Sequence, residues 1–232
     1  MIPKKIHYCW FGRGEKTKLA KRCIASWGKY CTDYEIIEWN EDNFDINYNA
    51  YTRRCYENKQ WAFLSDYVRL VVVNENGGVY FDTDVEVVKN FDELLRYSAF
   101  YGFEDDLHVN TGEGFGAEQG HSTVQEMLKE YSILLEGEHD VIGCPILNTQ
   151  ALVKKGLILD GKKQELDGSI VLPKEYLNPY NDLTGQLNKT KDTYAIHWYS
   201  KSWLSKKAIL RSKVTKPFHR IFGTKCFGWL KK

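Results

Sequence analysis

Asp82 and Asp84, separated by Thr83, are the residues whose type and spacing most directly suggest chemistry in this chain. They follow the apolar run 79–81, which predicts a short buried strand. Side chains two residues apart in extended chain point to the same side, so the two carboxylates can act on one ion. Carboxylate oxygens are the ligands that Mg²⁺ and Mn²⁺ prefer, commonly in combination with phosphates. The pair therefore predicts a divalent cation site.

The spacing of the two aspartates is weak evidence when taken alone. With 14 Asp among 232 residues, about 0.8 pairs of this spacing are expected by chance, and a helix-capping Asp or a solvated loop explains them equally well. Asp66 and Arg69 lie three residues apart on a predicted helix over 60–74. They form either a functional pair or a surface ion pair of little energetic weight.

The elements that position these residues alternate between strand and helix. Period-two and buried apolar runs predict strands, and apolar stripes of helical spacing predict helices. The predicted strands cover 2–11, 34–39, 79–81 and 99–103, and the predicted helices cover 16–29, 60–74, 91–97 and 122–135. Such alternation favours an α/β fold with a mainly parallel central sheet. These sheets bind ligands beyond the carboxyl ends of their strands, which is where Asp82 and Asp84 fall.

The composition is that of a folded soluble protein, with 43% hydrophobic and 27% charged residues. The N-terminus lacks the apolar stretch of a signal peptide, and the apolar runs are shorter than the roughly 18 residues that span a bilayer. Six cysteines show no zinc-site spacing. We therefore expect reduced, packed thiols and a cytoplasmic location.

The charges are distributed unevenly along the chain. Residues 193–232 contain ten Lys or Arg and no acidic residue, whereas residues 1–192 carry 22 basic and 31 acidic side chains. An acidic body argues against nucleic-acid binding. The tail from Leu204 mixes basic with large apolar residues, and Pro217 is expected to divide it into two short helices. Two interpretations stay open: helices on an anionic membrane surface, or a tail packed on the body.

Three segments in order resemble glycosyltransferase family 32, which includes bacterial capsular and surface-polysaccharide transferases. Residues 2–12 read I-P-K-K-I-H-Y-C-W-F-G and resemble the family's opening motif. Residues 62–69 (A-F-L-S-D-Y-V-R) and 77–85 (G-G-V-Y-F-D-T-D-V) resemble its core, and residues 193–203 (T-Y-A-I-H-W-Y-S-K-S-W) resemble its C-terminal element. The core is also similar, more distantly, to the clostridial glucosylating toxins. The resemblance spans residues 2–203.

The resemblance implies roles for five residues near the cation. Asp84 would ligate the metal, and Asp82 would contact the metal, the donor ribose or the sugar. His197 would be a third metal ligand, although the toxin relatives carry an acidic residue there. Asp66 and Arg69 would hold the donor sugar, with Arg69 also near the diphosphate, since arginine binds oxyanions through two parallel bonds.

Four further residues would contact the donor on the same basis, and Asn110 is added from its place in the sequence. Trp10 would stack on the nucleobase, a role that a flat indole suits. Ser200, Ser202 and Trp203 would close over the β-phosphate. Asn110 precedes a glycine-rich stretch and is expected to be a polar contact in a loop lining the donor sugar.

The resemblance implies a GT-A-like (Rossmann-like) nucleotide-sugar-binding fold over residues 1–203, followed by a basic helical extension over 204–232. It also implies Mn²⁺ or Mg²⁺, a UDP-sugar donor and retention of anomeric configuration. The acceptor would be a hydroxyl of a glycan, lipid-linked in capsule or surface polysaccharide synthesis. The basic tail would then place the enzyme at the inner face of a bacterial plasma membrane.

Two other functions fit parts of the sequence. A phosphotransferase or hydrolase could use the same acidic pair for Mg²⁺, but neither a nucleophilic-Asp pattern nor a P-loop lysine is present. A non-catalytic carbohydrate- or membrane-binding module would need neither Arg69 nor the acidic pair. Metal-dependent nucleotide binding separates these possibilities.

Overall fold

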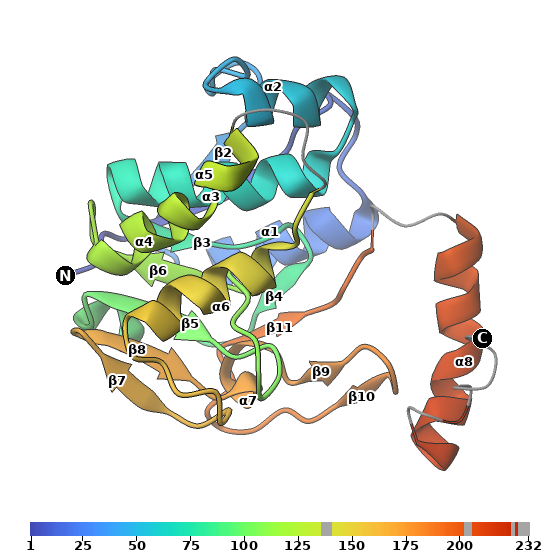
Figure 1. Ribbon diagram of the computed structural model, residues 1–232. Helices are drawn as coiled ribbons and strands as arrows, with labels where there is room; N and C mark the ends of the chain where they lie inside the picture. Colours follow the sequence, from blue (N-terminus) through green and yellow to red (C-terminus); the bar gives the residue numbers. More distant parts are fainter. Residues whose placement is uncertain (136–140, 202–205, 224–225, 227–232) are drawn as a thin grey trace.

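The computed structural model describes residues 1–135, 141–201, 206–223 and 226. Its centre is a seven-stranded sheet, flanked by helices (Figure 1). The strands lie in the order β2 (Glu35–Trp39), β1 (Lys5–Cys9), β3 (Gly78–Tyr80), β6 (Phe115–Ala117), β5 (Ala99–Gly102), β8 (Ser169–Leu172) and β7 (Gln164–Leu166). β2, β1, β3, β5 and β8 run in one direction, and β6 and β7 run in the opposite one. The predicted mainly parallel α/β sheet is confirmed.

The helices and short strands complete the two sides of the sheet. The helices are α1 (Lys18–Tyr30), α2 (Ala50–Glu57), α3 (Trp61–Asn76), α4 (Ser122–Glu130), α5 (Ser132–Leu135), α6 (Cys144–Lys154), α7 (Lys174–Leu177) and α8 (Lys206–Phe222), with a 3₁₀ turn at Leu94–Arg96. β4 (Val85–Val87) pairs antiparallel with β11 (Ala195–His197), and β9 (Tyr180–Asn181) pairs with β10 (Gln186–Leu187). Among the described helices, none is long and apolar enough to cross a membrane.

Alternating side chains of the central strands build a separate core on each face of the sheet. In β3, Tyr80 packs into the core beneath α3, α4 and α6, whereas Val79 and the following Phe81 pack on the opposite side with Trp27 of α1. Successive residues of a strand point to opposite faces, so a strand that is buried on both faces needs apolar residues at nearly every position. This explains why the buried strands lack a simple polar–apolar alternation.

The turn from α3 into β3 sets the position of the acidic pair. Gly77 and Gly78 both have positive φ angles, of 60° and 111°. A Cβ atom on Gly78 would lie 2.9 Å from the His7 ring and from the Lys5 carbonyl oxygen. Glycine is therefore needed for conformation and for space. His7 itself is fully buried between the Gly77 carbonyl oxygen (2.8 Å) and Trp39 (3.0 Å), as expected for a packed histidine.

Several predicted elements were wrong. The segment 91–97 forms only the 3₁₀ turn, because the Asn90 side chain accepts a bond from the Asp92 amide and competes with a helix. The polar residues between the predicted strand 34–39 and the predicted helix 60–74, where no element was predicted, contain α2, which begins at a capping box between Asn49 and Thr52. The glycine-rich stretch contains β6, which is too short to show a period.

The tail forms one helix, α8, that continues through Pro217, so the predicted division at this residue is wrong. Pro217 is exposed, and water can satisfy the carbonyl oxygen that lacks a helical donor. α8 stands beside the body (Figure 1) and contacts it through Lys216, which lies 3.1 Å from Asp182 and 2.8 Å from the Tyr180 hydroxyl. The predicted boundary at 203/204 falls outside the described residues and stays a prediction.

Candidate functional site

Asp82, Asp84 and His197 converge beyond the end of β3. The backbone runs from β3 through Asp82 and Asp84 into β4, and β4 pairs with β11 so that His197 lies opposite Val85. The three side chains offer two carboxylate oxygens and one imidazole nitrogen within 4.8 Å of one another. This cluster lies where the sequence predicted a cation site.

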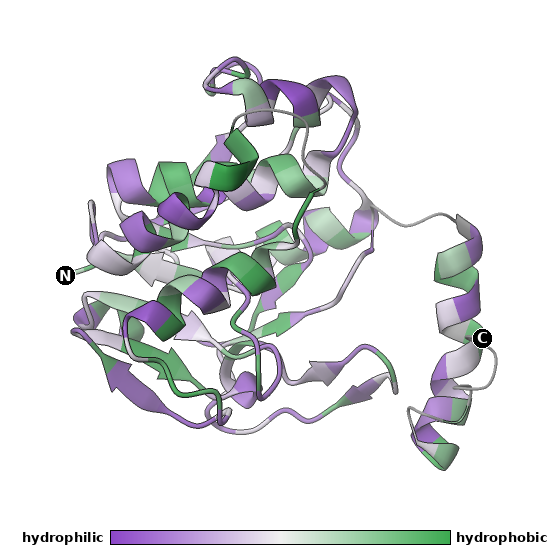
Figure 2. Cartoon of the chain, viewed as in Figure 1, coloured by the Kyte–Doolittle hydropathy of each residue, from purple (hydrophilic) through white to green (hydrophobic). Residues whose placement is uncertain are grey.

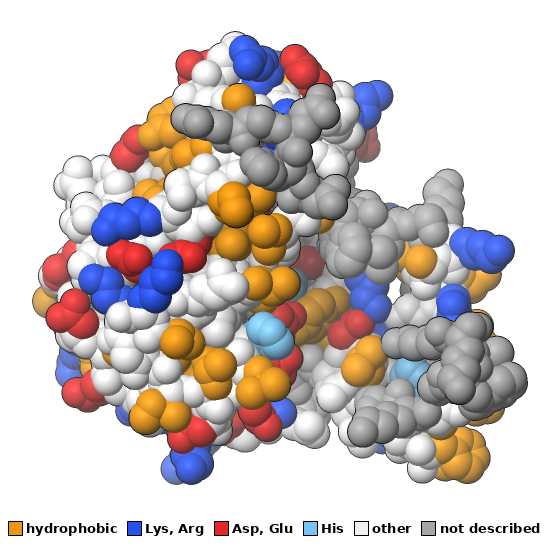
Figure 3. Space-filling model, viewed as in Figure 1, with side chains coloured by type: hydrophobic (Ala, Val, Ile, Leu, Met, Phe, Trp, Pro, Cys, Tyr) orange, Lys and Arg blue, Asp and Glu red, His pale blue; other side chains and the backbone are white. Residues whose placement is uncertain are grey.

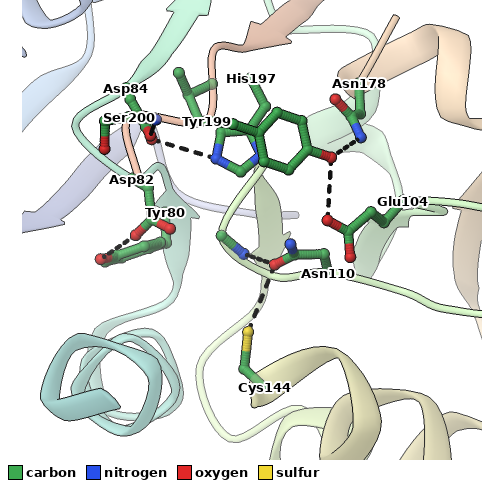
Figure 4. Close-up of polar contacts among 12 residues, drawn as sticks. Tyr80, Asp82, Asp84, Glu104, Asn110, Cys144, Asn178, His197, Tyr199 and Ser200 are labelled. Atoms are coloured by element: carbon green, nitrogen blue, oxygen red, sulfur yellow. Dashed lines mark hydrogen bonds and ion pairs between the residues drawn. The ribbon is translucent and has the colours of Figure 1, made fainter. Parts of the chain in front are cut away.

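Asp84 is the most firmly held of the three. His197 Nε2 lies 3.3 Å from one carboxylate oxygen, and the Ser200 amide donates to the other at 2.6 Å (Figure 4). The Trp198 amide donates to its backbone carbonyl oxygen at 3.0 Å. Burial by itself would raise the pKa of Asp84, but His197 and Ser200 outweigh it and hold the pKa below its usual range. Asp84 is therefore ionised at neutral pH.

His197 is buried at the end of β11, and its Nδ1 atom has no hydrogen-bond partner. Burial lowers the pKa of His197, but the charge of Asp84 more than offsets this and the net shift is upward. Imidazole binds a metal only when neutral. A cation entering this cluster therefore competes with a proton.

Arg69 links the helix α3 to the acidic pair. Its guanidinium is 2% exposed, and Nη2 lies 2.9 Å from Asp66 and 2.8 Å from Asp82. Tyr80 donates its hydroxyl proton to Asp82 at 3.0 Å. Burial raises the pKa of Asp82 to about 6; Arg69 opposes this shift, and Asp84 and Asp66 add to it. The interpretation of Asp66–Arg69 as a surface pair is wrong, because the pair is buried.

The loop that follows β5 packs against this cluster. Asn110 accepts a bond from the Gly112 amide at 2.7 Å, and the Cys144 thiol lies 3.5 Å from the same Asn110 oxygen (Figure 4). A Cβ atom on Gly112 would lie 2.3 Å from Asp82 Oδ2 and 2.8 Å from Arg69 Nη1. The loop thus packs directly against the acidic pair. The Asn110 side chain holds the loop in shape, and its amide oxygen is already used by the Gly112 amide.

Of the remaining predicted donor contacts, Ser200 joins this cluster through its backbone amide, whereas Trp10 bonds elsewhere. Trp10 follows β1, donates its indole N–H to the Gly14 carbonyl oxygen at 2.7 Å, and has the Lys16 ammonium 5.6 Å from its ring. Ser200 contributes its backbone amide to Asp84. Ser202 and Trp203 lie outside the described residues. The roles of these residues toward a donor stay predictions.

Residues that carried no assignment from the sequence surround the cluster. Tyr199 packs its ring on His197, with 4.1 Å between ring centroids, and donates to Glu104 at 3.0 Å. Asn178 donates to the Tyr199 hydroxyl (Figure 4). Tyr199 adopts a φ of 50°, which is uncommon for a non-glycine residue and is found at functional sites. Only the proximity of Tyr199 to His197 in the sequence could have pointed to it.

The chemistry of the three side chains fits a divalent cation. Two hard carboxylate oxygens and one imidazole nitrogen suit Mn²⁺ and Mg²⁺. The ligand atoms span at most 4.8 Å, and opposite ligands of Mg²⁺ are about 4.2 Å apart, so small side-chain rotations suffice. The Nδ1 atom of His197 has no partner, and the pKa of Asp82 is raised whereas that of Asp84 is lowered. Both observations fit a site that gains a positive charge.

Comparisons with known proteins agree with this geometry. Residues 17–101 match a family model described as a glycosyltransferase sugar-binding region containing a DXD motif. This segment includes Asp66, Arg69, Asp82 and Asp84. Over 46 residues, 20% of the chain, the sequence is 41% identical to "Glucan organizing enzyme 1" of Cryptococcus neoformans var. grubii. The aligned part is 13% of that protein's length.

Solved structures of similar fold include the PaToxG glycosyltransferase, with a TM-score of 0.54, 19% sequence identity and coverage of 67% of this chain and 69% of that one. The galactosyltransferase LgtC in complex with donor and acceptor sugar analogs aligns over 91% of this chain and 93% of that one, with 12% identity and a TM-score of 0.44. The chain thus has a GT-A-like α/β fold, and its residues 17–101 are similar to the DXD-containing sugar-binding region of glycosyltransferases.

Proposed function

We propose that this protein is a retaining glycosyltransferase of family 32 type that moves a hexose from a nucleotide diphosphate sugar, most simply a UDP-sugar, to a hydroxyl of a glycan. The observation that carries the proposal is the convergence of Asp82, Asp84 and His197 on one point, with the buried Arg69 behind them. A bound divalent cation supplies charge that offsets the diphosphate leaving group.

The protein's own residues divide the remaining work. Asp84 and His197 hold the cation, because they are buried and tied to β4 and β11. Asp82 is fixed by Arg69 and Tyr80, and it is free to serve the cation or the donor with its remaining lone pairs. In the exchange, the bond between the anomeric carbon and the phosphate oxygen breaks, the acceptor oxygen bonds to that carbon on the same face, and the leaving phosphate takes the acceptor proton.

The proposal is tested by screening nucleotide sugars for Mn²⁺-dependent hydrolysis and for thermal stabilisation, since a ligand that binds only the folded state raises the melting temperature. Asp84→Asn should abolish Mn²⁺-dependent stabilisation and lower turnover on the order of a hundredfold or more. The exposed Asp45→Asn is the matched control. Wild-type turnover in Asp84→Asn contradicts the proposal. Release of UMP and sugar 1-phosphate, instead of UDP and free sugar, indicates a hydrolase that cleaves the diphosphate.

We further propose that α8 binds an anionic membrane surface and brings the site to a lipid-linked acceptor. Leu210, Val214 and Ile221 project from one side of α8 and are 58–73% exposed. They lie within about 40° of one another around a helix of 3.6 residues per turn. Lys216, which contacts the body, lies on the opposite side. Figure 2 marks hydrophobic positions along this helix, and Figure 3 shows hydrophobic side chains on the surface in the region of the helix.

Charge decides which partner suits this face. α8 contains Lys and Arg residues and no acidic residue. A second basic helix would be repelled by it, whereas an anionic lipid surface attracts cations while its acyl region takes up the apolar side chains. These features support peripheral membrane binding. The inner face of a bacterial plasma membrane and a role in capsule or surface polysaccharide synthesis are proposed from the sequence resemblance to family 32.

Vesicle binding tests the membrane proposal. The protein should sediment with vesicles of phosphatidylcholine and phosphatidylglycerol but only weakly with phosphatidylcholine alone. Replacing Leu210 and Ile221 by Ser should weaken binding about tenfold or more. Replacing Ile133 and Ile158 by Ser is the control, because both are equally exposed on the body. Equal loss in the two double variants, or concentration-dependent dimers without lipid binding, contradicts the proposal.

A further inference from the structure

A cavity of about 350 Å³ lies beside the candidate metal site and is separated from it by Tyr199. Its walls are formed by Glu104 and Asp105, which follow closely after β5, by residues within 174–183 together with Asn188, and by Tyr199. A volume of this order accommodates a small polar molecule. None of these residues was assigned by the motifs in the sequence.

Tyr199 couples the cavity to the cluster of acidic residues and histidine. One side of its ring packs on His197, and its hydroxyl joins Asn178 to Glu104 on the cavity wall (Figure 4). The positive φ of Tyr199 costs free energy that the surrounding contacts must offset. A molecule in the cavity would therefore lie across one aromatic ring from the cation site.

The charge of the cavity excludes a phosphate. Glu104, Asp105 and Glu175 line it together with Asp182, and Lys174 is the one basic residue among the lining side chains. Asp182 is neutralised from outside the lining by Lys201 (2.5 Å) and Lys216 (3.1 Å). The net field is negative, so it repels the diphosphate of a donor and any acidic sugar.

The polar side chains of the cavity are mainly hydrogen-bond acceptors, so they favour a ligand that donates hydrogen bonds. Asn178 is 5% exposed and its amide oxygen has no partner, although the amide nitrogen donates to Tyr199. This oxygen is closed to solvent, so Asn178 shapes the cavity wall, and the acceptors open to a ligand come from other lining residues. Asn188 and the carboxylates supply such acceptors, and the rings of Tyr180 and Tyr199 add flat apolar surface for the C–H face of a sugar.

We propose that this cavity binds the acceptor and that the acceptor unit held there is a neutral, hydroxyl-rich sugar. The inference rests on the proposed glycosyl transfer for its meaning, and it adds the class of acceptor and the side of His197 from which the acceptor approaches. The donor diphosphate binds at the cation, and the acidic cavity on the far side of Tyr199 holds a neutral acceptor unit behind the reacting one, because the reacting hydroxyl itself must lie on the cation side of this ring.

Direct binding measurements test the cavity without requiring turnover. Saturation-transfer NMR is recorded on the protein with Mg²⁺, which is diamagnetic, and UDP, using methyl glycosides of glucose, galactose and mannose and methyl glucuronide as probes. At least one neutral glycoside should bind, and the glucuronide should bind more weakly. Asn188→Trp, which fills the cavity from an exposed position, should weaken neutral binding about tenfold or more. Lys189→Trp, one residue further and outside the lining, should not.

A charge reversal gives a second arm that does not depend on cavity volume. Asp105→Lys should improve glucuronide binding relative to the neutral glycosides, because a lining carboxylate becomes a cation. Asp106→Lys makes the same change at the neighbouring exposed residue, outside the lining, and should leave the preference unaltered. Circular dichroism and thermal unfolding confirm that each variant is folded, independently of nucleotide binding.

The failure of this inference differs from the failure of the proposed function. If no nucleotide sugar is bound or turned over but Asn188→Trp selectively blocks a neutral glycoside, the cavity inference stands and the catalytic proposal fails. If donor is hydrolysed but no neutral glycoside binds at millimolar concentration, or both Trp variants behave alike, the cavity inference is overturned. Binding of a lysine-rich peptide in place of the glycosides also overturns it and indicates a protein acceptor.

Discussion

Arg69 is the residue on which the acidic side of the site depends. Its guanidinium is almost fully buried and holds Asp66 and Asp82 together, while its Nη1 atom lies 3.5 Å from Thr111. Two carboxylates at such close quarters would repel each other without a cation between them. In this arrangement Arg69 is a positioning residue, and its predicted contact with the diphosphate would require part of this network to open.

Replacing Arg69 by Met should remove the charge while keeping most of the volume. The uncompensated pair Asp66 and Asp82 should lower the free energy of unfolding by about 3–5 kcal/mol, as for other broken buried ion pairs. Denaturant unfolding measures this loss. Arg22→Met is the control, because Arg22 pairs with Glu86 at the surface, where such a pair contributes about 0–1 kcal/mol. Similar losses in both variants would refute the structural role of Arg69.

At the scale of elements, two segments far apart in the chain hold the metal ligands in place. The β4–β11 pairing sets His197 beside Asp84, and the loop 110–114 packs under Asp82. Both are backbone features: the register of one antiparallel pair, and the absence of a side chain at Gly112. They determine how far the ligand atoms lie from one another.

Gly112→Ala should disturb the site without changing any charged group. The added Cβ atom would lie 2.3 Å from Asp82 Oδ2, so Asp82 or the loop must move. A displacement near 1 Å at a site of this kind commonly costs about a hundredfold in activity, and we expect weaker Mn²⁺ and UDP binding in calorimetry. Gly14→Ala, where an added Cβ atom meets nothing within 4 Å, should bind both as the wild type does. Unchanged affinity in Gly112→Ala would mean that the loop yields easily.

For the molecule as a whole, a buried acid links stability to pH. Glu113 is fully buried, and neither of its carboxyl oxygens has a hydrogen-bond partner. Burial raises the pKa of Glu113 well above 4.5, and the nearby Glu104 and Asp105 raise it further. The carboxyl group is therefore neutral in the folded protein and ionised in the unfolded chain near neutral pH.

The stability contributed by this raised pKa is fully present below the pKa of the unfolded chain and is lost as the pH rises through the folded pKa. One such proton gives a slope of up to about 1.4 kcal/mol per pH unit. Glu113→Gln should reduce this slope and raise the melting temperature at alkaline pH, with thermal unfolding followed between acidic and alkaline conditions. Part of the dependence of stability on pH should remain in Glu113→Gln, because the pKa values of Asp66 and Asp82 are also raised. The exposed Glu57→Gln is the control, and an unaltered slope in Glu113→Gln would show that this residue does not bind the proton.

Much of the framework could be predicted because it depends on local patterns. The strand before Asp82, the helix that carries Asp66 and Arg69 and the glycine turn between them follow from apolar runs, helical spacing and paired glycines. These features also placed the two carboxylates on one side of the chain. The short elements, α2 and β6, escaped because three to eight residues show too little periodicity.

The sequence by itself determined the α/β alternation, the acidic pair at a strand end and the basic, apolar tail, because each is a relation between neighbours in the chain. Tertiary structure alone decided that Arg69 is buried, that His197 meets Asp84 and that Tyr199 separates the cluster from an acidic cavity. It also decided that the apolar side of α8 faces away from the body. The physical reason is that strand register and helix docking depend on contacts between residues a hundred positions apart, which local periodicity does not record.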